Sequence, residues 1–393
     1  MKYDLNRIVD RTGTNSLKWE FGSRVHPKVT GNTLPLWVAD MDFPCAEPIL
    51  LALRKRIDRE IFGYSLHYTG EYFRAVCSWM QRRFNWWVHS EDIFVAPGIV
   101  PALSDLVRCF SKEGDGVIIQ RPVYGPFTSR VERNGRFVVD NALINKDGYY
   151  SMDFDDLEAK ASDPKNTMMI LCSPHNPVGR VWTEEELKKV ADICFSNDVV
   201  LVSDEIHYDI VRSGETHLVL DSLFPGDDRI ITCTAPSKSF NLAGMQVSHI
   251  VIRNDEYKKR WEAATGHPML SPLAITAVQA AYNESEDWLG QVNDYIDLNL
   301  EFIHTFLKEH LPDAVYRVPE GTYLAWIDLG AYVFEGDSLT DFLIEDAGVF
   351  IDGGNKFGPE YGSFQRINAA CPRAILEDCL GRVASSLKKR SSK

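Results

Sequence analysis

The chain has 393 residues, of which 45% are hydrophobic and 25% charged, and its formal net charge is −14. Such a composition is typical of globular proteins with a large core, and the length predicts two or three domains. We expect no nucleic-acid partner, because an acidic surface repels phosphate backbones, and no membrane-spanning helix, because the sequence has no run of about 18 apolar residues.

The first 45 residues are irregular, but from about residue 90 short runs rich in Val and Ile alternate with amphipathic stretches. Strands that are covered on both faces have this composition. We expect strands at 93–96, 117–120, 137–140, 168–172, 199–203, 230–234 and 247–252.

The clearest helix runs from Thr183 to about Asn197, because Thr183 and Glu186 make a T-x-x-E capping box at its start. Strand, helix and strand in this order predict βαβ units and therefore a mainly parallel sheet. We predict a large α/β domain over residues 46–285, with a mainly parallel seven-stranded sheet between helices.

The rest of the chain has a different pattern. A long helix is expected over 287–310, followed by an apolar segment at 322–328, a helix around 339–346, a strand at 363–368 and a final helix. This order predicts a smaller α+β domain of residues 286–393, together with the N-terminal segment 1–45.

Several common catalytic motifs are absent: no G-x-G-x-x-G follows a strand, and there is no P-loop, H-E-x-x-H or G-x-S-x-G. This argues against the common nucleotide-binding, zinc-protease and serine-hydrolase designs, and no motif indicates a metal. None of the eight cysteines forms a C-x-x-C pair, and the N-terminus lacks an apolar signal segment. We therefore expect reduced thiols in a cytoplasmic protein.

Polar groups follow five of the expected strands, and ligands of open parallel sheets bind beyond the C-terminal ends of the strands. These groups are a helix start suited to phosphate, an aromatic ring, an amide, a carboxylate and an amine. The segments that carry them are 97–101, 121–125, 173–180, 204–208 and 235–239. Together they fit a pyridine ring that bears a phosphate and an aldehyde.

These motifs resemble those of fold type I enzymes that depend on pyridoxal 5′-phosphate (PLP), the aspartate aminotransferase superfamily of class I/II. The resemblance covers nearly the whole chain and depends on P-H-N-P-x-G-R at 174–180, Asp204-Glu205 and Ser237-Lys238. A closer resemblance is to the MalY/PatB branch of cystathionine β-lyases, which are C–S lyases. It is carried by N-S-L-K-W at 15–19, L-W-V-A-D-M-D-F at 36–43, D-E-I-H at 204–207, P-S-K-S-F-N-L-A-G at 236–244 and R-I-N at 366–368.

The resemblance implies roles for the candidate residues. Lys238 would hold PLP covalently and then act as the base at the substrate Cα, since the pKa of a lysine falls readily when it is desolvated. Asp204 would pair with the protonated pyridine nitrogen. Asn176 would donate to the 3′ oxygen of the ring and touch the substrate carboxylate, which Arg366 would clamp.

The remaining contacts follow in the same way. Tyr124 would stack on the ring and His207 would touch its oxygen side, although each could be an ordinary core residue. The phosphate would be bound by Ser237 and by the amides of Gly98, Ile99 and Val100. Tyr64 would reach the phosphate across a dimer interface or act as an ordinary interface aromatic, and Ala39 is placed among the substrate contacts.

Two positions depart from the common pattern. Many members have a hydroxyl three residues before the lysine, where this chain has Ala235, and many have a basic residue eight positions after it, where this chain has Gln246. The phosphate is therefore expected to depend on other donors.

The expected reaction is α,β-elimination on a sulfur amino acid such as cystathionine or cysteine, giving pyruvate, ammonia and a thiol. Lys238 or Tyr64 would protonate the leaving thiolate. An aminotransferase on the same scaffold is the alternative, because it shares the steps up to deprotonation at Cα, and a regulatory protein that retains PLP is a third possibility. Because Tyr64 would serve a neighbouring subunit, we expect a homodimer.

Overall fold

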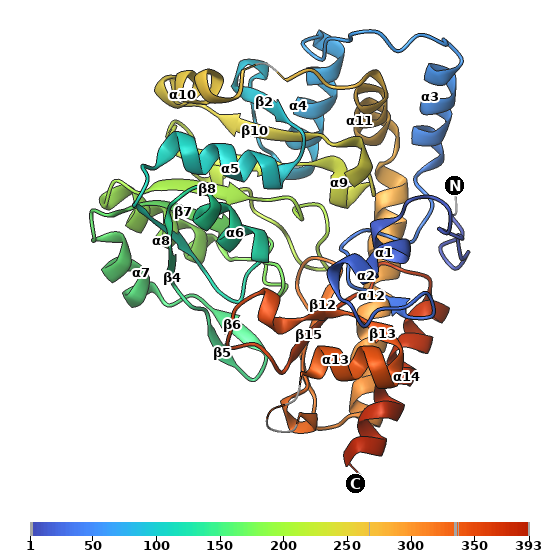
Figure 1. Ribbon diagram of the computed structural model, residues 1–393. Helices are drawn as coiled ribbons and strands as arrows, with labels where there is room; N and C mark the ends of the chain where they lie inside the picture. Colours follow the sequence, from blue (N-terminus) through green and yellow to red (C-terminus); the bar gives the residue numbers. More distant parts are fainter. Residues whose placement is uncertain (1–2, 267, 334–335, 337, 392–393) are drawn as a thin grey trace.

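Seven strands form one sheet in the spatial order β2-β10-β9-β8-β7-β3-β4 (Figure 1). The computed structural model describes residues 3–266, 268–333, 336 and 338–391. All neighbouring strands are parallel except β10, which runs antiparallel to β2 and β9. The strands are β2 (Ile93–Ala96), β3 (Gly116–Ile119), β4 (Phe137–Asp140), β7 (Asn166–Cys172), β8 (Val200–Asp204), β9 (Ile230–Thr234) and β10 (Ser248–Ile252). The prediction of a mainly parallel seven-stranded sheet is confirmed.

Helices cover both faces of this sheet. Successive residues of a strand point to opposite sides, so neighbouring side chains pack against different helices. Val117 and Ile119 of β3 pack in one hydrophobic cluster with α5 (Ile99–Phe110), α6 (Gly125–Arg133) and α10 (Asp255–Thr265). Ile118 packs in another with α7 (Phe154–Ala161) and α8 (Glu184–Ser196). Every position of β3, β9 and β10 is buried. The apolar runs at these three strands thus correspond to strands that are covered on both faces, whereas the edge strand β4 is only partly buried and Phe137 is exposed.

The start of α8 shows why the sequence signal was reliable there. Thr183 accepts from the backbone N–H of Glu186, and the Glu186 side chain accepts in return from the N–H of Thr183, so the predicted capping box is confirmed. Two otherwise unpaired donors are satisfied by residues only three positions apart. A local signal of this kind does not depend on the rest of the fold.

The C-terminal part forms a four-stranded antiparallel sheet in the order β11-β12-β15-β14. Its strands are β11 (Val315–Tyr316), β12 (Leu324–Asp328), β14 (Asp352–Gly353) and β15 (Phe364–Asn368). Beside it lie α12 (Glu286–His310), α13 (Leu339–Phe342) with a following π-helical turn at Leu343–Ala347, and α14 (Arg373–Ser391). The expected helices and strands of this part are confirmed, while the domain boundaries near residues 46 and 286 stay a prediction.

The N-terminal segment packs against this C-terminal part. Its strand β1 (Leu34–Pro35) pairs in parallel with β13 (Val349–Phe350). Two short helices precede β1, α1 (Leu17–Glu20) and α2 (Gly22–Val25). The helices α4 (Gly70–Phe84) and α11 (Pro272–Glu284) lie beside the large sheet, and α3 (Glu47–Ile57) packs against α11. A hairpin of β5 (Ile144–Lys146) and β6 (Tyr149–Ser151) completes the strands.

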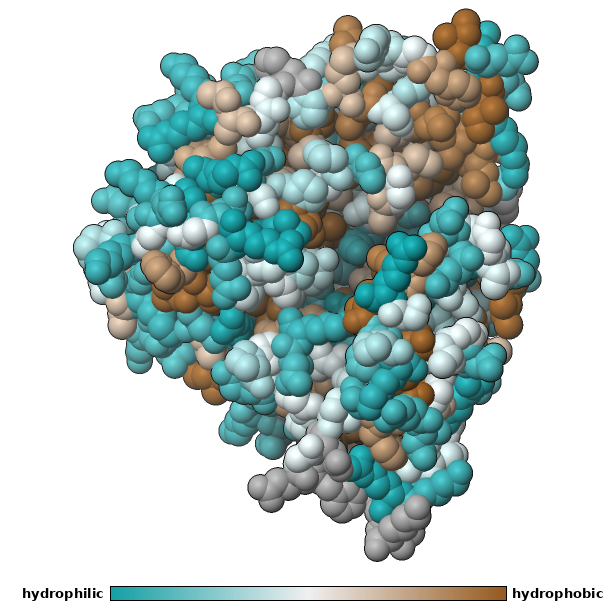
Figure 2. Space-filling model, viewed as in Figure 1, coloured by the Kyte–Doolittle hydropathy of each residue, from teal (hydrophilic) through white to brown (hydrophobic). Residues whose placement is uncertain are grey.

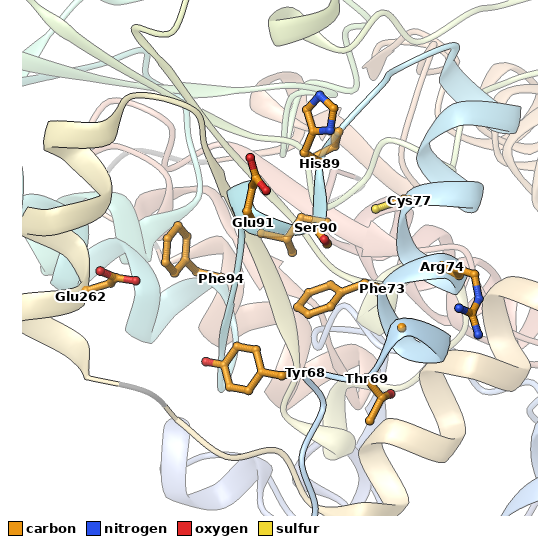
Figure 3. A pocket seen from close by; sticks show the side chains of 13 residues that line it. Tyr68, Thr69, Phe73, Arg74, Cys77, His89, Ser90, Glu91, Phe94 and Glu262 are labelled. Carbon is orange, nitrogen blue, oxygen red and sulfur yellow. The ribbon is translucent and has the colours of Figure 1, made fainter.

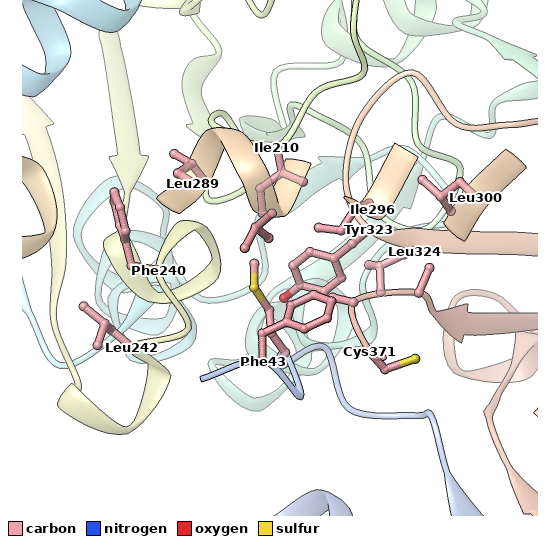
Figure 4. Close-up of a cluster of buried hydrophobic side chains, with 14 of the residues drawn as sticks. Phe43, Ile210, Phe240, Leu242, Leu289, Ile296, Leu300, Tyr323, Leu324 and Cys371 are labelled. Carbon is pink, nitrogen blue, oxygen red and sulfur yellow. The ribbon is translucent and has the colours of Figure 1, made fainter. Parts of the chain in front are cut away.

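One continuous buried cluster joins the two parts (Figure 4). It contains Phe43 from the N-terminal segment, Phe240 from the connection after β9, Leu289 from α12 and Tyr323 from the start of β12. These side chains come from positions far apart in the sequence, so their burial holds the N-terminal segment between the two sheets. No helix in the described ranges combines the length and the apolar character needed to cross a bilayer.

Candidate active site

The candidate site lies where β7, β8 and β9 end. The parallel register places Asp204 beside Cys172 and Cys233, so the loops that follow these strands meet at one edge of the sheet. A cavity of about 180 Å³ opens there. Its lining includes Ala39, Gly98, Ile99, Val100, Tyr124, Asn176, Asp204, His207, Ser237 and Lys238, with Cys172 and Gln246.

The structure therefore brings together the sequence-predicted residues, with two qualifications. Arg366 does not line this cavity, but its Nη1 donates to Oδ1 of Asn176 at 3.0 Å. Tyr64 lies outside the site, because its side chain is 97% exposed on the segment that follows α3. Within one chain Tyr64 cannot contact the groups that line the cavity.

Lys238 lies on the one-turn helix α9 (Pro236–Ser239), directly after β9. Its Nζ donates to the backbone carbonyl of Ala39 at 2.6 Å. Burial, reinforced by the nearby Arg366 cation, lowers the pKa of the Lys238 amine to about 8. An amine whose pKa lies closer to neutrality is a better nucleophile and base under physiological conditions.

Asp204 is the last residue of β8 and is almost fully buried. Burial raises the pKa of its carboxyl group to about 7, although one carboxylate oxygen accepts from the backbone N–H of Ile206 at 3.2 Å. A cation placed in the cavity beside this group would lower its pKa again and would itself be stabilised as a cation. The site is thus complementary to a positively charged partner at this end.

The opposite end of the cavity is built to accept an anion. Helix α5 begins at Ile99, and no side chain caps it. Gly98 precedes it with a φ of 136°, a conformation that side chains other than that of glycine rarely adopt, so the chain can turn sharply into the helix. The first amides of such a helix attract phosphate groups, and Ser237 adds a hydroxyl. Apart from Lys238, no lysine or arginine is among the residues that line the cavity.

Arg366, on β15, is held by several acceptors. Its Nη2 donates to the carbonyl of Trp37 at 2.9 Å and forms an ion pair with Asp352, while Asn176 receives Nη1. Its Nε is buried and has no hydrogen-bond partner in the described part of the chain. A buried guanidinium with an unused N–H is suited to receive a carboxylate from a ligand.

His207 and Tyr323 close the remaining side. Burial, together with the Lys238 and Arg366 cations, holds the pKa of His207 well below its usual range, so this imidazole is neutral. The His207 and Tyr323 rings meet edge to face with their centroids 5.8 Å apart, and the Tyr323 hydroxyl donates to the carbonyl of Ala39 at 2.8 Å. The sequence interpretation missed Tyr323 and Asp352. Both sit at ends of short apolar runs, but only the strand pairing of the small sheet shows where they point.

A larger cavity of about 800 Å³ lies elsewhere, beside the start of α4 (Figure 3). It is lined by Tyr68, Phe73, Arg74, Cys77 and neighbouring residues, and no lysine is among them. The space-filling view shows a separate hollow between the upper and lower parts of the molecule (Figure 2). The converging amine, carboxylate and amides, rather than the size of the cavity, distinguish the smaller site.

An amine, a carboxylate and helix amides around one cavity are typical of the fold type I enzymes that use PLP. Comparison with known proteins identifies the family. Residues 34–383 match the model of aminotransferase class I and II, and the chain belongs to this family.

Its relatives include cystathionine β-lyase PatB of Bacillus subtilis (strain 168), which is 42% identical over 382 residues that cover 96% of this chain and 98% of that protein. Protein MalY of Escherichia coli (strain K12) is 33% identical, covering 98% and 99%. The solved structure of the PLP-bound C–S lyase from Staphylococcus hominis is similar with a TM-score of 0.94 and 38% identity, covering 98% of both chains. The predicted family and fold are confirmed.

The cofactor of this family is PLP, and the residues present fit it. The Lys238 amine matches the aldehyde, and the Asp204 carboxylate, with its pKa raised by burial, matches a protonated pyridine nitrogen. The uncapped start of α5 matches the phosphate. Each of these groups faces the same cavity, which agrees with the order predicted from the sequence.

Proposed function

We propose that the protein is a PLP-dependent C–S β-lyase that carries out α,β-elimination on cystathionine- or cysteine-type amino acids, releasing pyruvate, ammonia and a thiol. The observation that carries this proposal is that Lys238 and Asn176 line one small cavity, with Arg366 bonded to Asn176 behind it, in a chain that is 42% identical to a cystathionine β-lyase. When bound, PLP supplies the electron sink for the negative charge at Cα.

Two groups would orient the substrate. The unused Nε of Arg366 would bind the α-carboxylate, beside the Asn176 amide that Arg366 already contacts. Asp204 would hold a positive charge at the far end of the cavity. Because His207 is neutral, it adds no further cation near Lys238. The substrate Cα is thereby fixed next to the base.

Lys238 would move the protons. Because its pKa is lowered, more of its amine is unprotonated near neutral pH, and this amine would take the Cα proton and then return a proton to the leaving sulfur. Tyr64 of a neighbouring copy is the second candidate donor to the sulfur. The carbonyl of Ala39 offers the amine a fixed acceptor at 2.6 Å.

We further propose a homodimer in which Tyr64 enters the site of the other copy. This proposal is supported by a patch of exposed apolar side chains on α3 and the segment after it, visible as brown atoms at the upper right of Figure 2. The patch comprises Leu51, Ile57, Ile61, Phe62, Tyr64, Leu66 and Tyr68. A second copy would cover such a patch, since large exposed apolar areas mark interaction surfaces. Sedimentation of the PLP-loaded protein as an active monomer would contradict it.

We also propose a cytoplasmic location. All eight cysteines are described by the structure as free thiols, and five of them are buried. Free thiols persist in reducing compartments. Fractionation of the native cells that recovered the protein outside the cytoplasm would oppose this.

The reaction is tested by incubating the PLP-loaded protein with L-cystathionine or L-cysteine in the absence of a keto acid. We expect pyruvate and ammonia over many turnovers, with free thiol or sulfide. A single conversion of the cofactor to its pyridoxamine form, reversed by a keto acid and without pyruvate, would instead identify an aminotransferase.

A further inference from the structure

Residues 36–43, which we call the strap, cross between the two sheets and are fixed mainly through their backbone. Apart from those at Ala39, three side chains donate to strap carbonyls: Arg366 to Trp37, Asn368 to both Val38 and Asp40, and Asn241 to Met41 and Phe43. Arg366 and Asn368 belong to the small sheet, whereas Asn241 lies after Lys238 in the connection between β9 and β10 of the large sheet. The strap is therefore tied to both parts of the molecule.

The carbonyl of Ala39 is at the centre of the strap. It accepts from Nζ of Lys238 at 2.6 Å and from the hydroxyl of Tyr323 at 2.8 Å. A carbonyl with two such donors restricts where the amine can lie. The orientation of the peptide after Ala39 consequently bears on the position of the base.

Two carboxylates on the strap, Asp40 and Asp42, meet two cations. Nζ of Lys18 lies 2.5 Å from Asp42 and 3.7 Å from Asp40, and Arg11 lies 2.7 Å from Asp40 and 2.8 Å from Asp42. The Lys18 side chain is 0% exposed, and the indole of Trp19 also donates to Asp42 at 2.9 Å. Burying charges in this way is unfavourable unless they are fully paired, so the geometry of the cluster is tightly constrained.

We propose that the cluster of Arg11, Asp40 and the buried Lys18 and Asp42 is a positioning device that holds the carbonyl of Ala39 as the acceptor for the Lys238 amine. The cluster fixes the residue after Ala39 from one side, while Asn368 and Arg366 fix the strap from the other. None of the four charged residues lines the 180 Å³ cavity. They would position the amine through the strap, while the charge of Asp40 also acts directly on Lys238 and raises the pKa of the amine. The inference rests on the proposed role of Lys238 as the base at Cα.

The competing explanation is that the cluster only stabilises the fold. The chain offers a matched control in Asp221, which is also buried, accepts from the indole of Trp86 and pairs with Arg253. Asp42→Asn and Asp221→Asn therefore each remove a buried carboxylate that pairs with an arginine and an indole, and Asp42→Asn also removes the partner of Lys18. Only the first lies on the strap.

Both variants are tested as PLP-loaded proteins with an α-deuterated substrate. For Asp42→Asn we expect the loss of deuterium from Cα to slow about 10- to 100-fold, with KM changed by less than about threefold, because small displacements of a base reduce the rate strongly. The deuterium isotope effect on kcat should rise, and the visible circular dichroism of the bound cofactor should change before any substrate is added. Asp221→Asn should lower Tm and leave these quantities unchanged.

The proposal would be overturned if Asp42→Asn and Asp221→Asn had the same rate of deuterium loss, the same isotope effect on kcat and the same circular dichroism. If Asp42→Asn does not fold, Arg11→Gln decides, because Asp42 keeps Lys18 as a partner in that variant. An Arg11→Gln protein with unchanged deuterium loss and unchanged circular dichroism would equally refute the inference. Loss of the Cα deuterium is common to lyases and aminotransferases, so a wild-type protein that makes no pyruvate would overturn the proposed reaction without deciding the role of the cluster.

Discussion

The edge of the large sheet and the strap contribute to the same site in different ways. At the sheet edge, the register of β7, β8 and β9 delivers Asp204 and the loops of Asn176 and Lys238 to one place. The strap has no partner strand at Ala39, and it is positioned by side chains from distant parts of the chain. The sheet edge supplies the reactive groups, while the strap and the small sheet determine how these groups are oriented.

We expect the largest effect from replacing Lys238, the amine at the sheet edge. Lys238→Ala should lower the rate of pyruvate formation by about 10³-fold or more, since it removes both the cofactor linkage and the base. Borohydride reduction followed by mass spectrometry should find no cofactor on the variant peptide. A variant that retained turnover would show that another group removes the Cα proton.

The next effect tests the small-sheet side. Arg366→Lys should lower kcat/KM about 100-fold, mainly through KM, because a lysine cannot reproduce the planar set of donors that reaches Asn176, Trp37 and a carboxylate together. Steady-state kinetics with L-cystathionine measure this. A fall in kcat at constant KM would place Arg366 outside substrate binding.

A third prediction separates stability from function at the sheet edge. The pKa of Asp204 is raised to about 7 in the folded protein, against a usual value of 3.8, so its contribution to stability is complete below the unfolded pKa and is lost as the pH rises through about 7. Asp204→Asn should therefore stabilise the cofactor-free protein relative to wild type at pH 8 by on the order of 1–3 kcal/mol, but not at pH 4. Urea unfolding at the two pH values measures this. If the free energy of unfolding differed between variant and wild type by the same amount at pH 8 and at pH 4, the raised pKa of Asp204 would be contradicted.

The smallest effect concerns the proposed partner copy. Tyr64→Phe should weaken PLP binding about tenfold, the loss of one hydrogen bond to a charged group, without changing the oligomeric state. Fluorescence titration of the cofactor-free protein measures the affinity. Unchanged affinity would mean that Tyr64 contributes only to the interface.

The sequence predicted the sheet edge better than the strap, for a physical reason. Asp204 ends one strand and Lys238 lies a few residues after another, the apolar runs of both strands are visible in the sequence, and parallel strands end at a common edge. Asp352 and Tyr323 depend on antiparallel pairings between short segments that a single sequence does not reveal. The segment 36–43 was recognised only by resemblance, and the burial of Lys18 beside it was not foreseen, because a lysine on a short polar stretch gives no sign of burial.

The neutral end of the cavity has a consequence for how the enzyme keeps its cofactor. With Ala235 and Gln246 in place of a hydroxyl and a cation, the chain would hold the phosphate through amides, Ser237 and Tyr64 of a neighbouring copy, and the covalent link to Lys238 would supply much of the retention. That link would open in each catalytic cycle when Lys238 is released to act as the base. We therefore expect the enzyme to lose cofactor faster while it is working than while it is idle, so that its activity in the cell follows the supply of free PLP.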